Sequence, residues 1–240
     1  MSTVPLRYRF ELPDGQEHRF ALELDRDTAQ LASPTLPAPP EWTRLDFQQC
    51  RSCPLDPAKQ PHCPAALHLA GVIDRFSDLV SYDLVRVVVE TDEREVSARL
   101  SAQQGLASLI GLIMASSGCP RTAVFRPMAR FHLPFSSETE TAYRVASMYL
   151  MARHFAAGAG RANDPSGLEG LHRIYEGLHA VNKGMAQRLR AASRQDAIVN
   201  AIVLLDVLVT LVPATIEELL EEIKPVFAAL LREAGDPPAI

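Results

Sequence analysis

The segment Gln49-Cys50-Arg51-Ser52-Cys53-Pro54-Leu55 organises the interpretation of this chain, together with His62-Cys63-Pro64 and Gly118-Cys119-Pro120. These stretches hold all four cysteines of the 240 residues, and three of the cysteines are followed directly by proline. A CxxC pair lets one turn supply two thiolates to one metal ion, and structural zinc takes four tetrahedral ligands. The spacing therefore predicts a single metal site, with Cys50, Cys53, Cys63 and Cys119 as its ligands.

The identity of the cofactor stays open from the sequence. Zinc is the first expectation, and an iron-sulfur cluster is the alternative, because four thiolates suit both and Cys-Pro also occurs at cluster ligands. Thiol or disulfide redox chemistry and the absence of any cofactor are the other two alternatives. His62 or His132 could replace one cysteine as a ligand. Zinc on four thiolates is coordinatively closed, so it would stabilise the fold rather than catalyse a reaction.

Composition narrows the class of protein. Apolar residues make up 47% and charged residues 22% of the chain, which is ordinary for a globular protein. A net charge of -5 argues against nucleic acid as a partner. No apolar signal segment is present near Met1, and the longest apolar run, 197–212, is too short and too polar for a membrane span. We therefore expect a cytoplasmic protein without a membrane partner, whose cysteines serve as ligands or thiols.

Local patterns predict an α+β fold, mostly an α-helical bundle with a small antiparallel sheet. Residues 6–12 and 17–24 alternate around a Pro-Asp-Gly-Gln turn, which predicts an N-terminal β-hairpin. The β-branched run 84–91 predicts one further strand. Helical spacing and end signals predict helices over 64–81, 96–116, 138–157, 168–193, 194–212 and 214–234, the last one kinked at Pro225.

These elements are expected to form a single domain over 1–240. The hairpin occupies 1–31, and a proline-rich connector with the cysteine loop occupies 32–65. The helical body, with the inserted strand, occupies 66–234.

A second candidate site follows the last cysteine. Arg126, Arg130 and His132 lie in a proline-interrupted segment that we expect to be extended, just before a helix whose capping box is Ser137 and Glu140. Cationic groups beside a helix N-terminus favour anions. The pattern predicts a small anionic ligand or a protein partner here, although pairing with surplus carboxylates is the simpler explanation.

Other charged positions are predicted to be structural. The cations Lys183, Arg188, Arg190 and Arg194 fit a solvated helix face. Asp206, in an apolar stretch, needs a polar partner if it is buried.

No nucleophile elbow, dinucleotide-binding, P-loop or zinc-protease motif is present, so no catalytic residue is proposed and enzymatic activity is left undecided. The CxxCP, HCP, SGCP and PMARFHLPF blocks resemble those of an uncharacterised bacterial protein family, over most of the chain up to residue 212. The resemblance implies no activity and no functional residue. The sequence thus predicts a metal-stabilised binding or regulatory protein, with an iron-sulfur or thiol-based redox protein or sensor as the alternative. Apolar terminal helices allow a homodimer.

Overall fold

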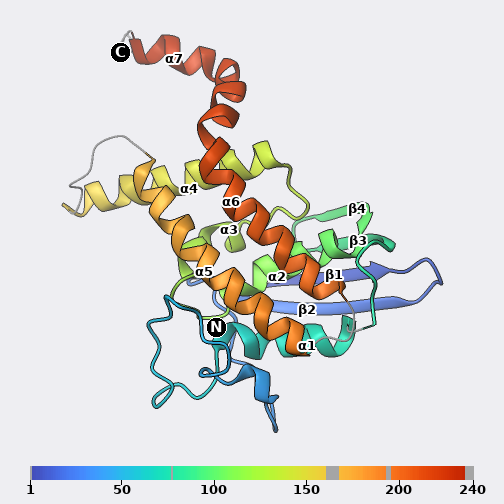
Figure 1. Ribbon diagram of the computed structural model, residues 1–240. Helices are drawn as coiled ribbons and strands as arrows, with labels where there is room; N and C mark the ends of the chain where they lie inside the picture. The colour runs from blue at the N-terminus through green and yellow to red at the C-terminus, as the bar shows by residue number, and fades with distance from the viewer. Residues whose placement is uncertain (1, 77, 161–167, 193–195, 236–240) are drawn as a thin grey trace.

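The computed structural model describes residues 2–76, 78–160, 168–192 and 196–235 (Figure 1). One antiparallel sheet has the strand order β2-β1-β3-β4. Its strands are β1 (Thr3–Glu11), β2 (Glu17–Asp25), β3 (Leu84–Glu90) and β4 (Glu95–Ser101). The helices of the described residues are α1 (Pro64–Phe76), α2 (Ala102–Ser116), α3 (Arg126–Arg130), α4 (Glu138–Gly158), α5 (Glu169–Ala192), α6 (Ala197–Ile223) and α7 (Ala228–Gly235). The α+β prediction is confirmed.

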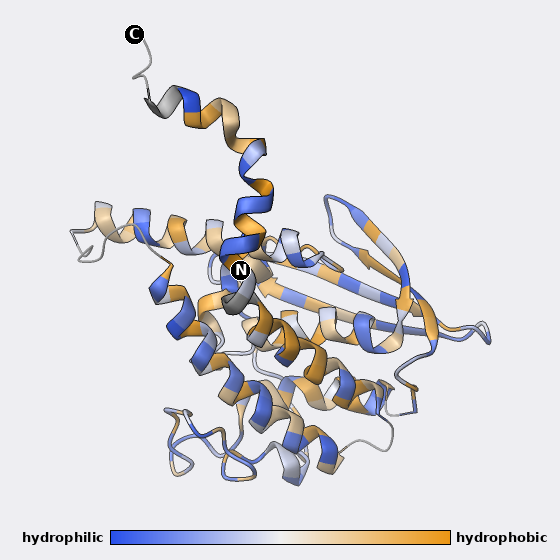
Figure 2. Cartoon of the chain, turned by 45° about the horizontal axis from the view of Figure 1, so that its top comes forward, coloured by the Kyte–Doolittle hydropathy of each residue, from blue (hydrophilic) through white to orange (hydrophobic). Residues whose placement is uncertain are grey.

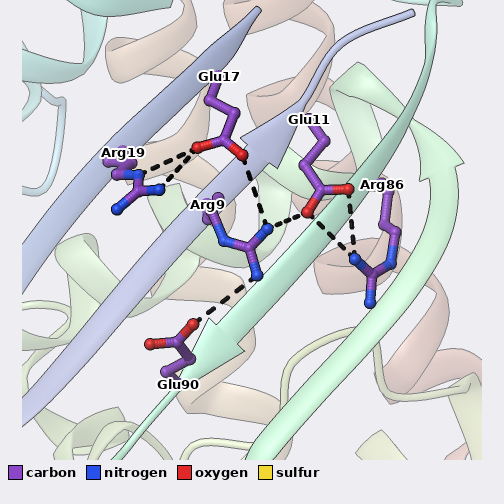
Figure 3. A network of polar contacts seen from close by, with 6 residues as sticks. All are labelled: Arg9, Glu11, Glu17, Arg19, Arg86 and Glu90. Carbon is purple, nitrogen blue, oxygen red and sulfur yellow. Dashed lines mark hydrogen bonds and ion pairs between the residues drawn. The ribbon is translucent and has the colours of Figure 1, made fainter. Parts of the chain in front are cut away.

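The sheet has one buried face and one charged face because apolar and charged side chains alternate along β1. Leu6, Tyr8 and Phe10 point into the core with at most 2% exposure. On the opposite face Arg9 is the centre of an ion-pair network across β1, β2 and β3 (Figure 3). Its other members are Glu11, Glu17, Arg19, Arg86 and Glu90. Alternating side chains thus separate core from solvent, as expected for a sheet covered on one face.

The predicted helix over 96–116 is wrong in its first third. Residues Glu95–Ser101 form β4, paired with β3 around the charged turn at 91–94, and α2 begins only at Ala102. The sequence EVSARLS alternates polar and apolar residues, which fits an edge strand, and the side chains of Ser101 and Gln104 make a capping box that starts the helix. Two hairpins therefore meet through β1 and β3.

Helix α2 is the centre of the helical layer. It contacts β3 and β4 on one side and α1 and α6 on others, and nearly all its apolar side chains are buried. Helices α5 and α6 pack beside each other over it (Figure 1). The main core therefore runs continuously from the sheet through α2 into α5 and α6.

Several other predicted elements differ in the structure. The segment predicted as extended forms a 3-10 turn (Ala123–Phe125) and then α3, because Pro127 stands in the first helical turn, where a missing N–H costs nothing. Helix α6 continues to Ile223 instead of ending near 212, so it includes the first part of the separate helix predicted over 214–234. Helix α1 ends at Phe76, whereas the prediction extended it to residue 81. Near Pro225 the chain becomes a 3-10 helix, Lys224–Phe227, where a kink was predicted.

Helix α4 and the C-terminal segment contain apolar residues, coloured orange in Figure 2, and several of these residues are exposed. On α4, Leu150, Met151 and Phe155 are 49–67% exposed, although apolar residues on most faces of this helix indicate burial on both sides. The end of α6 and α7 project away from the body in Figure 1. Within the described residues no single helix is long and apolar enough to span a bilayer. The segments Ala197–Leu211 and Thr215–Arg232 have the required length and composition only when they are taken together, and the chain bends between them.

Candidate metal centre

All four cysteines line one small cavity of about 20 Å³. Cys50 and Cys53 come from the loop between the 3-10 turn Glu41–Thr43 and α1, Cys63 directly precedes α1, and Cys119 follows α2. Helix α5 contributes Val181, Met185 and Arg188 to the remaining wall, and the other lining residues are Leu45, Leu55, Pro64, Ala65 and Arg121. The structure thus brings together thiols that are up to 69 positions apart in sequence, counting from Cys50 to Cys119.

Local backbone geometry presents each thiol. The N–H of Cys53 donates to the carbonyl of Cys50 at 2.9 Å, which closes the CxxC turn. Cys63 stands at the N-terminus of α1, where the free N–H groups of Ala65 and Ala66 donate to its sulfur. Gly118 has φ +86°, the left-handed conformation expected past a helix end, and it turns Cys119 back towards the loop.

The cavity is a poor environment for negative charge on bare thiols. Burial, followed by the proximity of Cys63 and Cys119, raises the pKa of the Cys50 thiol to about 12. Burial also raises the pKa of Cys63, against the opposing effect of the two N–H groups. Arg188 acts in the lowering direction on both thiols. All four cysteines are free of disulfide bonds.

Helix α5 approaches the cysteine loop so closely that it needs a glycine. A Cβ atom on Gly184 would lie 2.8 Å from Cys50 Sγ and 3.2 Å from its Cα. The Cys50 thiol donates to the carbonyl of Val181 at 3.8 Å. Any side chain at position 184 would therefore push the loop and α5 apart.

Arg188 is the site residue that the sequence interpretation placed wrongly. It was predicted on a solvated face, yet it is only 1% exposed. Its guanidinium donates to the carbonyls of Trp42 and Leu45, each at 2.9 Å, and to that of Arg44. Lys183 and Arg190 are exposed as predicted, whereas Arg194 lies outside the described residues. Arg188 therefore fastens the start of the cysteine loop to α5.

The thiols share a cavity without forming a coordination sphere. Within the part of the chain that the structure describes, no group of three or more His, Cys, Asp or Glu side chains has an arrangement that could hold a metal ion. The metal and its identity therefore remain a prediction.

A family model for Domain of unknown function (DUF6901) matches residues 6–228. The chain belongs to the DUF6901 family. The matched span runs from the first strand to the first residue of α7 and includes all four cysteines. No curated protein and no solved structure matches the chain.

The second predicted site of this DUF6901 member is not assembled as one group. Arg126 donates to Gln30 at 2.8 Å, and the Arg130 guanidinium lies over the Phe131 ring. Only His132 lines a larger cavity, described below. Burial and the charge of Arg144 lower the pKa of His132 to about 3, so its imidazole is neutral near pH 7.

The other candidate ligands and polar groups have structural contacts. His62 Nδ1 lies 2.8 Å from the Thr43 hydroxyl. Asp206 pairs with His179 Nδ1 at 2.9 Å, which supplies the partner that its apolar context called for.

Proposed function

We propose that this protein is a metal-stabilised binding protein in which Cys50, Cys53, Cys63 and Cys119 bind one zinc ion. The observation that carries the proposal is the single cavity lined by all four cysteines of the chain. Zinc there would join the loop before α1 to the turn after α2, beside α5. The ion would hold the fold together and would leave no open coordination position for catalysis.

The charge of Arg188 supports an anionic centre in this cavity. An arginine side chain stays protonated in proteins, and burying a charge is costly unless another charge compensates it. Among the described residues Arg188 donates only to carbonyls and makes no ion pair, its charge acts on the exposed Asp46 only as a minor cause of the lowered pKa of that carboxyl, and its buried Nε has no hydrogen-bond partner. Four thiolates on a divalent cation carry a net charge of about −2, which would compensate the guanidinium.

The size of the cavity favours one ion over a cluster. A volume of about 20 Å³ is close to the space that one water molecule occupies. A single zinc ion fits that space, whereas a cube of iron and sulfide would require the loop to move outwards. Ligation also requires the four sulfur atoms to converge on one point, and we propose that changes of the cysteine χ1 rotamers contribute to this.

Elemental analysis of the protein purified under reducing conditions tests the proposal. We expect one zinc per chain and a colourless solution. Cys53→Ser should lose zinc and unfold at a lower temperature, whereas Ser52→Ala, in the same turn, should keep zinc.

Three outcomes would contradict this proposal. A brown protein containing iron and sulfide would replace zinc by the iron-sulfur alternative. A wild-type protein that neither contains nor takes up stoichiometric zinc would refute metal binding at this cavity. A Cys53→Ser protein that keeps its zinc would place the ion elsewhere.

A further inference from the structure

A second and much larger cavity also borders α5, which lines it with Tyr175, Leu178 and Asn182. Its volume is about 500 Å³, within the range typical of small-molecule sites. Its walls come from α2, α4, α5 and α6 and from the segment around α3. The exposed residues Glu138 and Val207 belong to its lining, so the cavity reaches the surface.

Most of the wall is aliphatic, aromatic or methionine. Representative side chains are Leu112, Met114, Phe125, Met128, Leu178 and Leu208. A ligand there gains mainly by removing apolar surface from water, at about 25 cal/mol per Å². The shape and composition of the wall therefore favour a largely apolar molecule.

One side of the cavity carries a hydrogen-bonded group of three side chains. The Tyr8 hydroxyl lies 3.0 Å from Ser108 Oγ and 2.5 Å from His132 Nε2, and Ser108 and His132 line the cavity. Burial raises the pKa of Tyr8, and His132 is neutral near pH 7, so the group carries no charge. It offers polar contacts without selecting an ion.

Asn182 supplies the feature that points to a ligand. It lines the cavity from α5 and is only 2% exposed, yet its amide nitrogen has no hydrogen-bond partner within the described residues. Leaving a buried donor unpaired costs about 1–3 kcal/mol. An acceptor oxygen on a bound molecule would remove this cost.

The ionised groups of the lining do not favour a charged ligand. Of the described residues that line the cavity, Arg144 and Glu138 are the only ones of the Asp, Glu, Lys and Arg types, and their charges are opposite. Arg144 already donates to the carbonyls of Met128 and Phe131. We infer that this cavity binds an uncharged, largely apolar small molecule whose carbonyl-type oxygen accepts a hydrogen bond from Asn182.

Fluorescence titration with prodan, an uncharged naphthalene ketone, tests the inference. Its emission shifts to shorter wavelength in apolar surroundings, and dimethylaminonaphthalene provides the same ring system without the ketone. We expect saturable binding of one prodan per chain. Asn182→Leu keeps the number and branching of the side-chain heavy atoms but removes the donor, and it should weaken prodan roughly tenfold, as for the loss of one hydrogen bond. The ketone-free probe should bind this variant within about twofold of wild type.

A filling variant locates the site. Ala107 on α2 lines the cavity, so Ala107→Phe should abolish binding of both probes, while Gln103→Phe, on the same helix outside the lining, should not. Absence of saturable prodan binding to the wild type, or equal prodan affinity in Asn182→Leu and wild type, overturns the inference. If Ala107→Phe does not fold, the two-probe comparison in Asn182→Leu decides alone.

Discussion

Replacing Arg188 by methionine measures how strongly α5 holds the cysteine loop. The substitution removes three hydrogen bonds from a charged donor to the carbonyls of Trp42, Arg44 and Leu45. Hydrogen bonds to charged groups contribute about 1.5–3 kcal/mol each, so the gross loss is roughly 4–9 kcal/mol. Removing a buried charge returns several kcal/mol of desolvation cost. We therefore expect a net destabilisation of about 3–5 kcal/mol, the range for breaking a buried charged contact.

Thermal unfolding followed by circular dichroism measures this difference. For a chain of 240 residues, 1 kcal/mol corresponds to about 2–4 °C, so Arg188→Met should unfold roughly 6–20 °C below wild type. Arg190→Met is the matched control, because Arg190 is exposed on the same helix, and it should stay within about 0.5 kcal/mol. If both variants unfold within about 2 °C of wild type, the carbonyl contacts of Arg188 do not hold the loop and the reasoning is refuted.

Three further substitutions probe other parts of the structure. Gly184→Ala places a Cβ 2.8 Å from Cys50 Sγ, so it should lower the free energy of unfolding by about 1–3 kcal/mol and reduce the amount of bound zinc. Gly177→Ala is the control on the same helix: it has open space around it and should raise the melting temperature. The folded pKa of His132, about 3, lies below the unfolded value of 6.5, so its contribution to stability is complete above pH 6.5 and falls as the pH drops towards 3. His132→Gln should therefore weaken the acid-side loss of stability by about 1–3 kcal/mol in urea titrations between pH 7 and 4, and an unchanged slope would exclude this residue as the cause. Arg9→Gln should cost about 1 kcal/mol or less, and 1 M NaCl should remove most of that difference because the network is partly exposed; a cost that persists in salt would point to packing instead.

The elements that sequence predicted well are those encoded by neighbouring residues. The first hairpin, the strand β3 and the capping box of α4 follow from alternation, β-branching or cap chemistry within a few residues. The failures lie where two local signals compete. Residues 96–101 suit a helix by composition but form β4, since the preceding turn allows them to pair with β3. Proline at 127 was interpreted as a helix breaker although it begins α3.

The candidate sites show the same division. Spacing and residue type identified the four cysteines, which line one cavity, but could not show that α5 forms the opposite wall. Arg188 contacts carbonyls more than 140 positions away in the sequence. It was predicted to be solvated because arginine usually is, and its position in the helical repeat was not used. That register was the available signal, because Val181, Met185 and Arg188 recur at helical spacing on one face. No local pattern joins Tyr8, Ser108 and His132, so the larger cavity could not be predicted.

Helix α5 lines both cavities with different residues, and this arrangement makes the two proposals independently testable. Leu178 and Asn182 face the larger cavity, while Val181 and Met185 face the cysteines. If α5 acts as a rigid wall, Asn182→Leu should leave zinc content unchanged, and Gly184→Ala should leave prodan affinity unchanged. If the Cβ at position 184 instead displaces the whole helix, both readouts change together, and the effects of the two substitutions on stability should depart from additivity by more than about 0.5 kcal/mol. A double-mutant cycle therefore distinguishes an α5 that lines the two cavities independently from an α5 whose movement couples them.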